Sequence, residues 1–352
     1  MLSKSEIFFY RAAIFSFFIL FSSIYCTAAE ESSEGGESFN PAELITRHIA
    51  DSHVWHLWEG HYGTIPLPVI LFSSDRGFEV FSSGNFYNEH HELVEYGGYK
   101  LENDHIIPID TGRSIFDLSI TKNVASMFIS VILMLWIFFK VKKGYRVNEG
   151  KAPSGVQSFF EPIIIFIRDE VAKPNIGVKY ERYLPYLLTI FFFIWFNNMM
   201  GLLPGSANVT GNIAVTLTLA LFTFLMTQIS GNKNYWGHIF NTPGVPWWLK
   251  IPVPLMPLVE MIGVFTKPFS LTVRLFANIT AGHIIILSLF SIIFIFESIW
   301  IGPVSVLFAI FMNFLELFVA LLQAFIFTIL SAMYLGGAVA EHHEAHEGAK
   351  HE

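Results

Sequence analysis

Charged residues are scarce in this sequence. Only 14% of the 352 residues are Asp, Glu, Lys or Arg, and none of these occurs between Tyr183 and Asn232. A typical soluble domain carries about 25%. A chain that is 53% hydrophobic cannot cover a globule with polar surface, and it is equally unlike a disordered protein. The composition and the mean hydropathy of +0.51 therefore indicate an integral membrane protein.

Cysteine is almost absent as well. The single residue, Cys26, excludes an intramolecular disulfide framework and a cysteine-based metal cluster. The net charge of −8 argues against nucleic acid as a partner. No GxxxxGK[ST] motif is present, so we expect no ATP-binding loop. With no arrangement typical of nucleophilic catalysis, we expect a chain that is not an enzyme by itself and that carries no cofactor.

The N-terminus reads as a secretory signal. Residues 1–29 combine a basic start, a short apolar core and small residues before a cleavage site after Ala29. Cleavage there would remove Cys26. The alternative is a lipoprotein signal ending at Cys26, which the bulky Tyr25 disfavours.

Three further segments follow. Residues 30–115 are polar, contain turn signals and short alternating pieces, and hold seven of the 13 histidines, so we expect a periplasmic segment with a few small strands. Residues 116–340 form the membrane domain, and residues 341–352 form a histidine-rich tail. Some histidines have spacing that could hold a metal, but histidines in polar segments are more often merely solvated, and no metal site is predicted. These histidines are His53, His56, His61, His342, His343 and His346.

Five apolar stretches are long enough to cross a bilayer, which takes about 20 residues. They are Asn123–Phe139, Tyr183–Leu203, Thr210–Ser230, Leu258–Phe296 and Ile299–Ala340. The last two would each measure about 60 Å as helices, twice the thickness of the hydrocarbon core, which is about 30 Å. We therefore expect an all-α membrane protein with about five membrane helices, the last two forming a strongly tilted hairpin.

The distribution of cations predicts the orientation. Nine Lys and Arg residues lie between the first two stretches, which marks that segment as cytoplasmic. Within it, residues 155–173 have apolar residues at helical spacing and indicate a helix on the membrane surface. Five crossings from an external N-terminus place the C-terminus in the cytoplasm. We expect a multi-pass protein of the bacterial inner membrane.

A few ionisable residues interrupt the apolar helices. Glu260, Lys267 and Arg274 recur every seven residues, so they share one helix stripe within about 20° per step, and Asn278 joins it. Glu260 and Lys267 can alternatively be explained by snorkelling near the interface. An arginine at membrane depth costs about 2.5–3.5 kcal/mol. Because it stays protonated, it cannot relay a proton, but it can hold a facing carboxylate ionised. We therefore interpret the stripe as a gate, where a carboxylate that faces Arg274 is favoured to release its proton.

The opposite side of the same helix carries His283. It follows Arg274 by nine residues, which places it about 180° away. On the last helix Glu316 and Gln323 are seven residues apart and share a face, with Asn313 close by. His283 and Glu316 could form a purely structural pair, but histidine titrates near neutrality, and we favour proton handling along an aqueous access route.

Three sequence blocks carry a resemblance to a known family. Ser270–His283, Leu322–Phe327 and Asn198–Leu221 resemble blocks of subunit a of F-type ATP synthases, and the likeness covers roughly residues 120–340. It implies a stator channel beside a rotating ring of c subunits. Two half-channels would load and unload protons on a ring carboxylate and so couple the proton gradient to ATP synthesis.

The resemblance also assigns roles. Arg274 matches the essential arginine that faces the ring, and Asn278 and Gln323 match polar residues near it. Glu260 and Ser270, with Lys267 on the same stripe, match the cytoplasmic half-channel.

This sequence departs from the family in three places. The family often has an acidic residue at the position of His283 and a histidine at that of Glu316, so the pair is exchanged here, which supports a contact between them. Gly201 replaces an acidic residue of some members, and residues 30–115 are an addition to the minimal pattern.

The implied partners are the c-subunit ring, the peripheral-stalk subunit b, the other subunits of the complex and the lipid bilayer. The expected ion is H⁺. Na⁺ is the alternative, because the carboxylate that binds the ion in this family sits on another chain and is not part of this sequence. The rival function is a self-contained ion channel or secondary transporter, which predicts inverted repeats and a broken-helix site at the midplane.

Overall fold

The computed structural model describes most of the chain. The described residues are 50–56, 63–88, 93–102, 104–110, 112–203, 205, 207–240, 255–296 and 302–340. The predicted signal segment with Cys26, the histidine-rich tail and His61 lie outside them. The chain forms two compact units, one of Met1–Ser130, Asn197–Val209 and Thr280–Leu317, the other of Val131–Phe196, Thr210–Ile279 and Phe318–Glu352.

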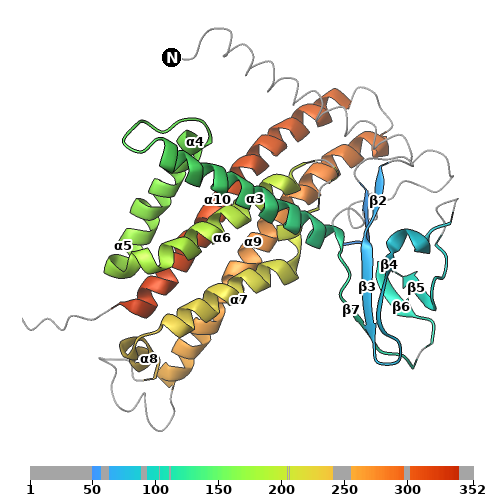
Figure 1. Ribbon diagram of the computed structural model, residues 1–352, viewed down its shortest axis with the longest axis horizontal. Coiled ribbons are helices and arrows are strands. Elements are labelled where there is room, and N and C mark those ends of the chain that lie inside the picture. Colours follow the sequence, from blue (N-terminus) through green and yellow to red (C-terminus); the bar gives the residue numbers. More distant parts are fainter. Residues whose placement is uncertain are drawn as a thin grey trace, which may run out of the picture. The chain divides into compact units, whose positions relative to one another are not determined.

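Within the described residues, five helices are long and apolar enough to cross a membrane, which confirms the expected all-α membrane architecture. They contain α3 (Lys122–Val147), α6 (Tyr180–Gly201), α7 (Ile213–Ser230), α9 (Leu255–Phe296) and α10 (Gly302–Val339) (Figure 1). The second candidate span also includes the helical segment before α6. The helix α3 continues beyond the predicted apolar stretch because its basic C-terminal residues are good helix formers.

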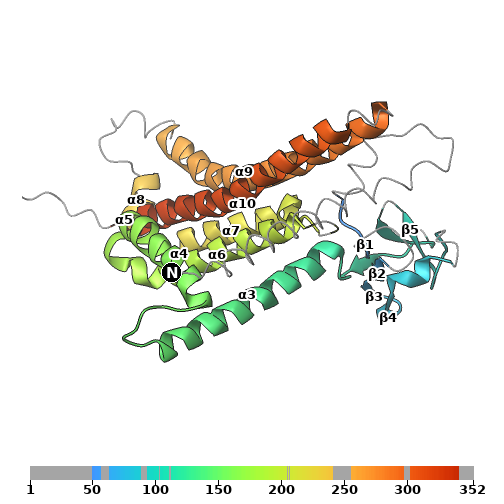
Figure 2. The same cartoon turned by 90° about the horizontal axis from the view of Figure 1, so that it is seen from above.

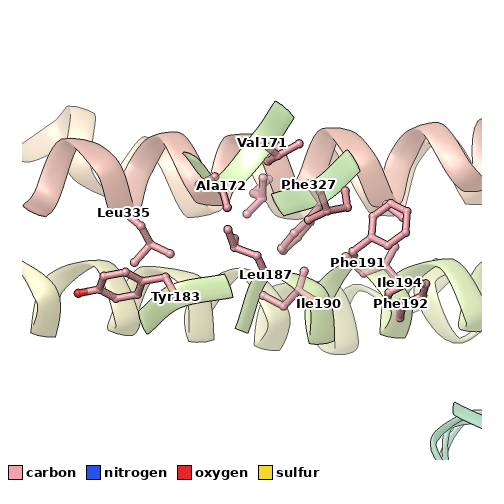
Figure 3. Packing of buried hydrophobic residues seen from close by; sticks show 14 of the residues in the cluster. Val171, Ala172, Tyr183, Leu187, Ile190, Phe191, Phe192, Ile194, Phe327 and Leu335 are labelled. Atoms are coloured by element: carbon pink, nitrogen blue, oxygen red, sulfur yellow. The ribbon is translucent and has the colours of Figure 1, made fainter. Parts of the chain in front are cut away.

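The second unit has an apolar core in which helices pack closely. Leu187 of α6, Leu275 of α9 and Phe327 of α10 are buried there, and Figure 3 shows side chains of α6 and α10 meeting in this layer. Membrane helices gain little from the hydrophobic effect and associate by close packing, for which small residues are suited. Fully buried Ala324 and Ala332 of α10 serve this purpose.

The basic segment before α6 is helical, as expected, but parts of it are more deeply buried than predicted. It consists of α4 (Val156–Phe166), a π-helical stretch η3 (Ile167–Ala172) and α5 (Lys173–Ile176). Ile167 and Val171 are completely buried in the core of the second unit. Part of the apolar stripe therefore packs on protein: the ring of Phe160 contacts that of Phe192 in α6, and the ring of Phe166 contacts that of Phe325 in α10.

The first unit contains small antiparallel sheets, as predicted for the polar segment. β1 (Val54–His56) pairs with β2 (Thr64–Pro66). A second sheet has the order β4–β3–β7. Its strands are β3 (Pro68–Ser73), β4 (Gly77–Ser82) and β7 (Ile115–Asp117).

The hairpin of β5 (Tyr99–Glu102) and β6 (His105–Pro108) packs on one face of this sheet. Val69 and Leu71 of β3 form the core there with Tyr99. Strands and helices are seen from a second direction in Figure 2.

Hydrogen bonds tie these strands to neighbouring parts of the same unit. The Asp51 carboxylate accepts hydrogen bonds from the backbone N–H groups of Ser52 and Asn123, at 3.0 and 3.2 Å, and so helps to cap the start of α3. The Trp55 indole donates to the carbonyl oxygen of Gly205 at 2.7 Å, in the segment between α6 and α7.

Candidate functional site

His283 of α9 and Glu316 of α10 meet inside the first unit. The Nε2 atom of His283 lies 3.9 Å from Oε1 of Glu316, and the two side chains are 14% and 4% exposed. Neither oxygen of Glu316 accepts a hydrogen bond from the described part of the chain. The expected contact between these two residues is therefore present.

Glycines make room for this pair. A Cβ atom at Gly282 would lie 2.7 Å from Oε1 of Glu316, so the carboxylate occupies the space that a side chain would fill. A Cβ atom at Gly201 would lie 3.9 Å from Nε2 of His283. Gly201 thus borders His283 and places no side chain of its own beside the imidazole.

The chemistry of this arrangement follows from burial. An ionised carboxylate without a hydrogen-bond donor is costly in an apolar interior, so Glu316 needs a proton, a water molecule or a cation in contact. His283 can supply a proton or accept one. A buried His–Glu pair between two membrane helices is therefore suited to passing protons.

Arg274 lies in the second unit on the exposed side of α9. Its side chain and that of Asn278 are exposed, whereas Leu271 and Leu275 are buried on the packed side of the helix. The ion pairs found among the described residues do not include Arg274. A fixed cation on the outer surface of a membrane helix is expensive.

Three other predicted residues have less defined roles. Gln323 of α10 is buried, with 4% of its surface exposed. Ser270 of α9 is half-buried. Asn313, expected near Glu316, donates to the carbonyl oxygen of Ala309 at 3.1 Å, within its own helix.

Glu260 and Lys267 border a common cavity in the second unit. The cavity has a volume of about 270 Å³ and is also lined by His238 and Tyr334, but not by Ser270. Nδ1 of His238 lies 4.0 Å from Oε1 of Glu260, and Nζ of Lys267 lies 5.4 Å from the centre of the Tyr334 ring. We call this space the Glu260 cavity.

His238 was missed by sequence reasoning. It lies in the short helix α8 (Lys233–Phe240), which the sequence presents only as part of a connecting segment. Its distance of 22 residues from Glu260 follows no helical period, so no local signal could have joined the two residues.

Comparison with known proteins identifies the helical part. The family model described as ATP synthase A chain matches residues 124–336. The chain belongs to this family. The match includes Arg274, His283 and Glu316, together with Glu260, Lys267, His238 and Tyr334 of the Glu260 cavity.

Individual relatives of this chain carry the name ATP synthase subunit a as well. ATP synthase subunit a of Chloroherpeton thalassium is 49% identical over 254 residues, which are 70% of this chain and 73% of the relative. ATP synthase subunit a 2 of Chlorobaculum tepidum is 51% identical over 240 residues, 66% of each chain. ATP synthase subunit a of an Anaeromyxobacter species is 39% identical over 323 residues, 88% of this chain and 73% of the relative. The last match is too long to be confined to the membrane helices.

The strand-containing segment has a match of its own. A model described only as a domain of unknown function covers residues 44–126, which include the strands and the first residues of α3. Among the described residues, no three His, Cys, Asp or Glu side chains gather as a metal site would require. His53 instead lies 3.2 Å from the Asp117 carboxylate.

Proposed function

We propose that this chain is the proton-translocating stator subunit a of the membrane sector of an F-type ATP synthase. It is a multi-pass membrane subunit of the complex and is not catalytic by itself. The observation that carries the proposal is the exposed Arg274 on a membrane-spanning helix of this family. Such a cation needs an anionic partner on a neighbouring molecule, and a ring carboxylate that passes it would be held ionised while it is close.

Two routes would bring protons to that carboxylate and away from it. His283 and Glu316 would belong to the external half-channel, because they are a buried pair that can exchange protons. Glu260, Lys267 and Ser270 would belong to the cytoplasmic half-channel, and the cavity beside Glu260 supports this role for the first two. Asn278 and Gln323 would act as polar neighbours of Arg274.

The proposed function implies the partner subunits, the membrane and the side of the membrane on which each segment lies. The c-subunit ring would pass the exposed side of α9, and the peripheral-stalk subunit b would hold the chain in place. We place the protein in the bacterial inner membrane. After a signal peptide at residues 1–29, residues 30–115 would lie in the periplasm and residues 116–340 would form the proton channel. The tail at residues 341–352 would lie in the cytoplasm, and H⁺ would be the transported ion.

The continuity of α9 argues against a self-contained transporter. Such proteins place discontinuous helices around a site at the midplane. In contrast, α9 runs without interruption from Leu255 to Phe296, and its arginine is on the outer surface rather than in a closed site. Both features suit a partner that moves past the helix.

Substitution of Arg274 tests the proposal. In the assembled complex, Arg274→Ala should abolish ATP-driven proton pumping into inverted vesicles, measured with a pH-sensitive dye, while the subunits still co-purify. Arg146→Ala, which removes a cation from the end of α3, is the matched control and should pump normally. Undiminished pumping by the Arg274→Ala complex would refute the proposal.

A further inference from the structure

One face of the three-stranded sheet is apolar and exposed. Phe72 is 40% exposed, Phe78 71%, Val80 68%, Phe116 71% and Leu118 54%. Contiguous apolar surface of this kind marks a contact with another protein or with a membrane. We call these five residues the outer sheet face.

The strand register makes the outer sheet face continuous. Phe72 in the central strand β3 is paired with Phe78 on one side and with Phe116 on the other, and the ring centres of Phe72 and Phe78 are 4.9 Å apart. Side chains alternate along a strand, so the outward positions can be counted. They are Pro68, Ile70, Phe72, Phe78, Val80, Ser82 and Phe116, and none is charged.

The other face of the same sheet already contributes to the protein core. Val69 and Leu71 are completely buried there, against Tyr99 and Ile106 of the β5–β6 hairpin. An antiparallel sheet with one face in water normally alternates apolar and polar residues. Here the outer face is apolar although the opposite face already forms the core, which is the pattern of a sheet that is covered on both sides.

The chain holds the outer sheet face close to a membrane helix. Asp117, the last residue of β7, is five residues from Lys122, the first of α3, so their Cα atoms are at most about 18 Å apart. This connection is not a loose tether. Leu118 and Ile120 donate backbone hydrogen bonds to Ile70 and Pro68 of β3, at 2.9 and 3.1 Å.

We propose that the outer sheet face rests on the lipid bilayer, with its phenylalanines at the boundary between headgroups and acyl chains. The membrane is the apolar medium that α3 would cross, and only four residues separate β7 from that helix. Apolar side chains at this depth bind without a specific partner. Because no outward side chain is charged, the contact needs no anionic lipid and is insensitive to salt.

Fluorescence quenching tests this contact in the assembled complex. With Cys26 replaced by Ser, a single cysteine is introduced at Val80 on the outer sheet face, or at Lys100 on β5 as a control whose side chain is 46% exposed. Each variant carries an environment-sensitive dye and is placed in nanodiscs of zwitterionic lipid with brominated acyl chains. The label at position 80 should be quenched by the lipid at least threefold more than the label at position 100.

The alternative results are distinct. Equal quenching of both labels by aqueous iodide would show that the face lies in water and would overturn the proposal. Protection of position 80 from both lipid and iodide would also overturn it, and would indicate cover by another subunit or by residues 1–49 of this chain. Deletion of that segment separates these two cases. A label introduced by Phe116→Cys repeats the test if Val80→Cys prevents assembly.

Discussion

Nε2 of His283 lies 3.9 Å from Oε1 of Glu316, and Gly282 leaves the space that the carboxylate occupies. The contact joins the helices α9 and α10, whereas several neighbouring side chains, such as Ile285 and Phe318, are exposed. Because either residue can give or take a proton, the contact is compatible with an exchange of the two residue types between the helices.

Gly282→Ala should separate this pair without unfolding the subunit. The new Cβ atom would lie 2.7 Å from Oε1 and 3.0 Å from Cδ of Glu316, and the flexible end of a glutamate can move away at little cost. Contacting residues typically couple by about 0.5–3 kcal/mol, so proton pumping should fall at least about twofold at normal assembly. Gly302→Ala in α10 is the control, because its Cβ atom meets nothing within 4 Å. Equal pumping by both variants would show that the pair is not needed.

Exchange of the two residues tests the pair itself. The double variant His283→Glu, Glu316→His keeps one imidazole and one carboxylate in contact, whereas His283→Ala or Glu316→Ala leaves the other group alone. ATP-driven pumping by the double variant should therefore exceed that of both alanine variants. If all three lose activity equally, the residues do not act as a pair.

The membrane helices follow from the sequence because lipid imposes simple requirements. Backbone groups must be satisfied within each segment, and about 20 apolar residues are needed to cross. The burial of Ile167 and Val171 did not follow, since an amphipathic pattern is the same whether its apolar side meets lipid or another helix. The outcome depends on the other helices that contribute to the same core, which lie far away in the sequence.

The candidate site likewise combines features that follow from the sequence with features that do not. The opposite faces of Arg274 and His283 follow from helical spacing alone, and the structure has Arg274 exposed and His283 largely buried. The proximity of His238 to Glu260 depends on where a short connecting helix folds back, which no periodicity encodes. Likewise, a side chain at position 282 of α9 would collide with Glu316 of α10. The sequence around Gly282 gives no sign of this contact with another helix.

Gly336→Ala should destabilise the subunit. A Cβ atom at Gly336 in α10 would overlap the backbone carbonyl of Asn175 in α5, and a backbone group cannot rotate away as a side-chain end can. Overpacking of this kind costs about 1–3 kcal/mol, so the thermal unfolding midpoint of the purified complex should fall. Gly337→Ala, at the adjacent position where nothing lies within 4 Å, should leave it unchanged. A midpoint equally lowered in both variants would mean that loss of glycine, rather than the overlap, is responsible.

Asp117 should make the strand-containing segment sensitive to acid. Partial burial raises the pKa of Asp117, but hydrogen bonds from His53 and Ser119 outweigh this and hold the pKa at about 2. An unfolded aspartate has a pKa of about 3.9. The lowered pKa therefore stabilises the folded segment fully above about pH 4, and this contribution is lost as the pH falls toward 2.

Pepsin digestion of the intact complex between pH 4 and pH 2 measures this effect, because the protease is active throughout the range. Cleavage within residues 63–88 should accelerate as the pH falls. The Asp117→Asn variant should be cleaved faster than the unmodified chain at pH 4. The difference should shrink toward pH 2, where Asp117 of the unmodified chain becomes protonated in the folded as well as in the unfolded state. Glu102→Gln removes a carboxylate whose ion pair with Lys100 is exposed on the surface, and it should behave like the unmodified chain. A constant difference for Asp117→Asn at every pH would mean that the asparagine acts through packing and not through the charge.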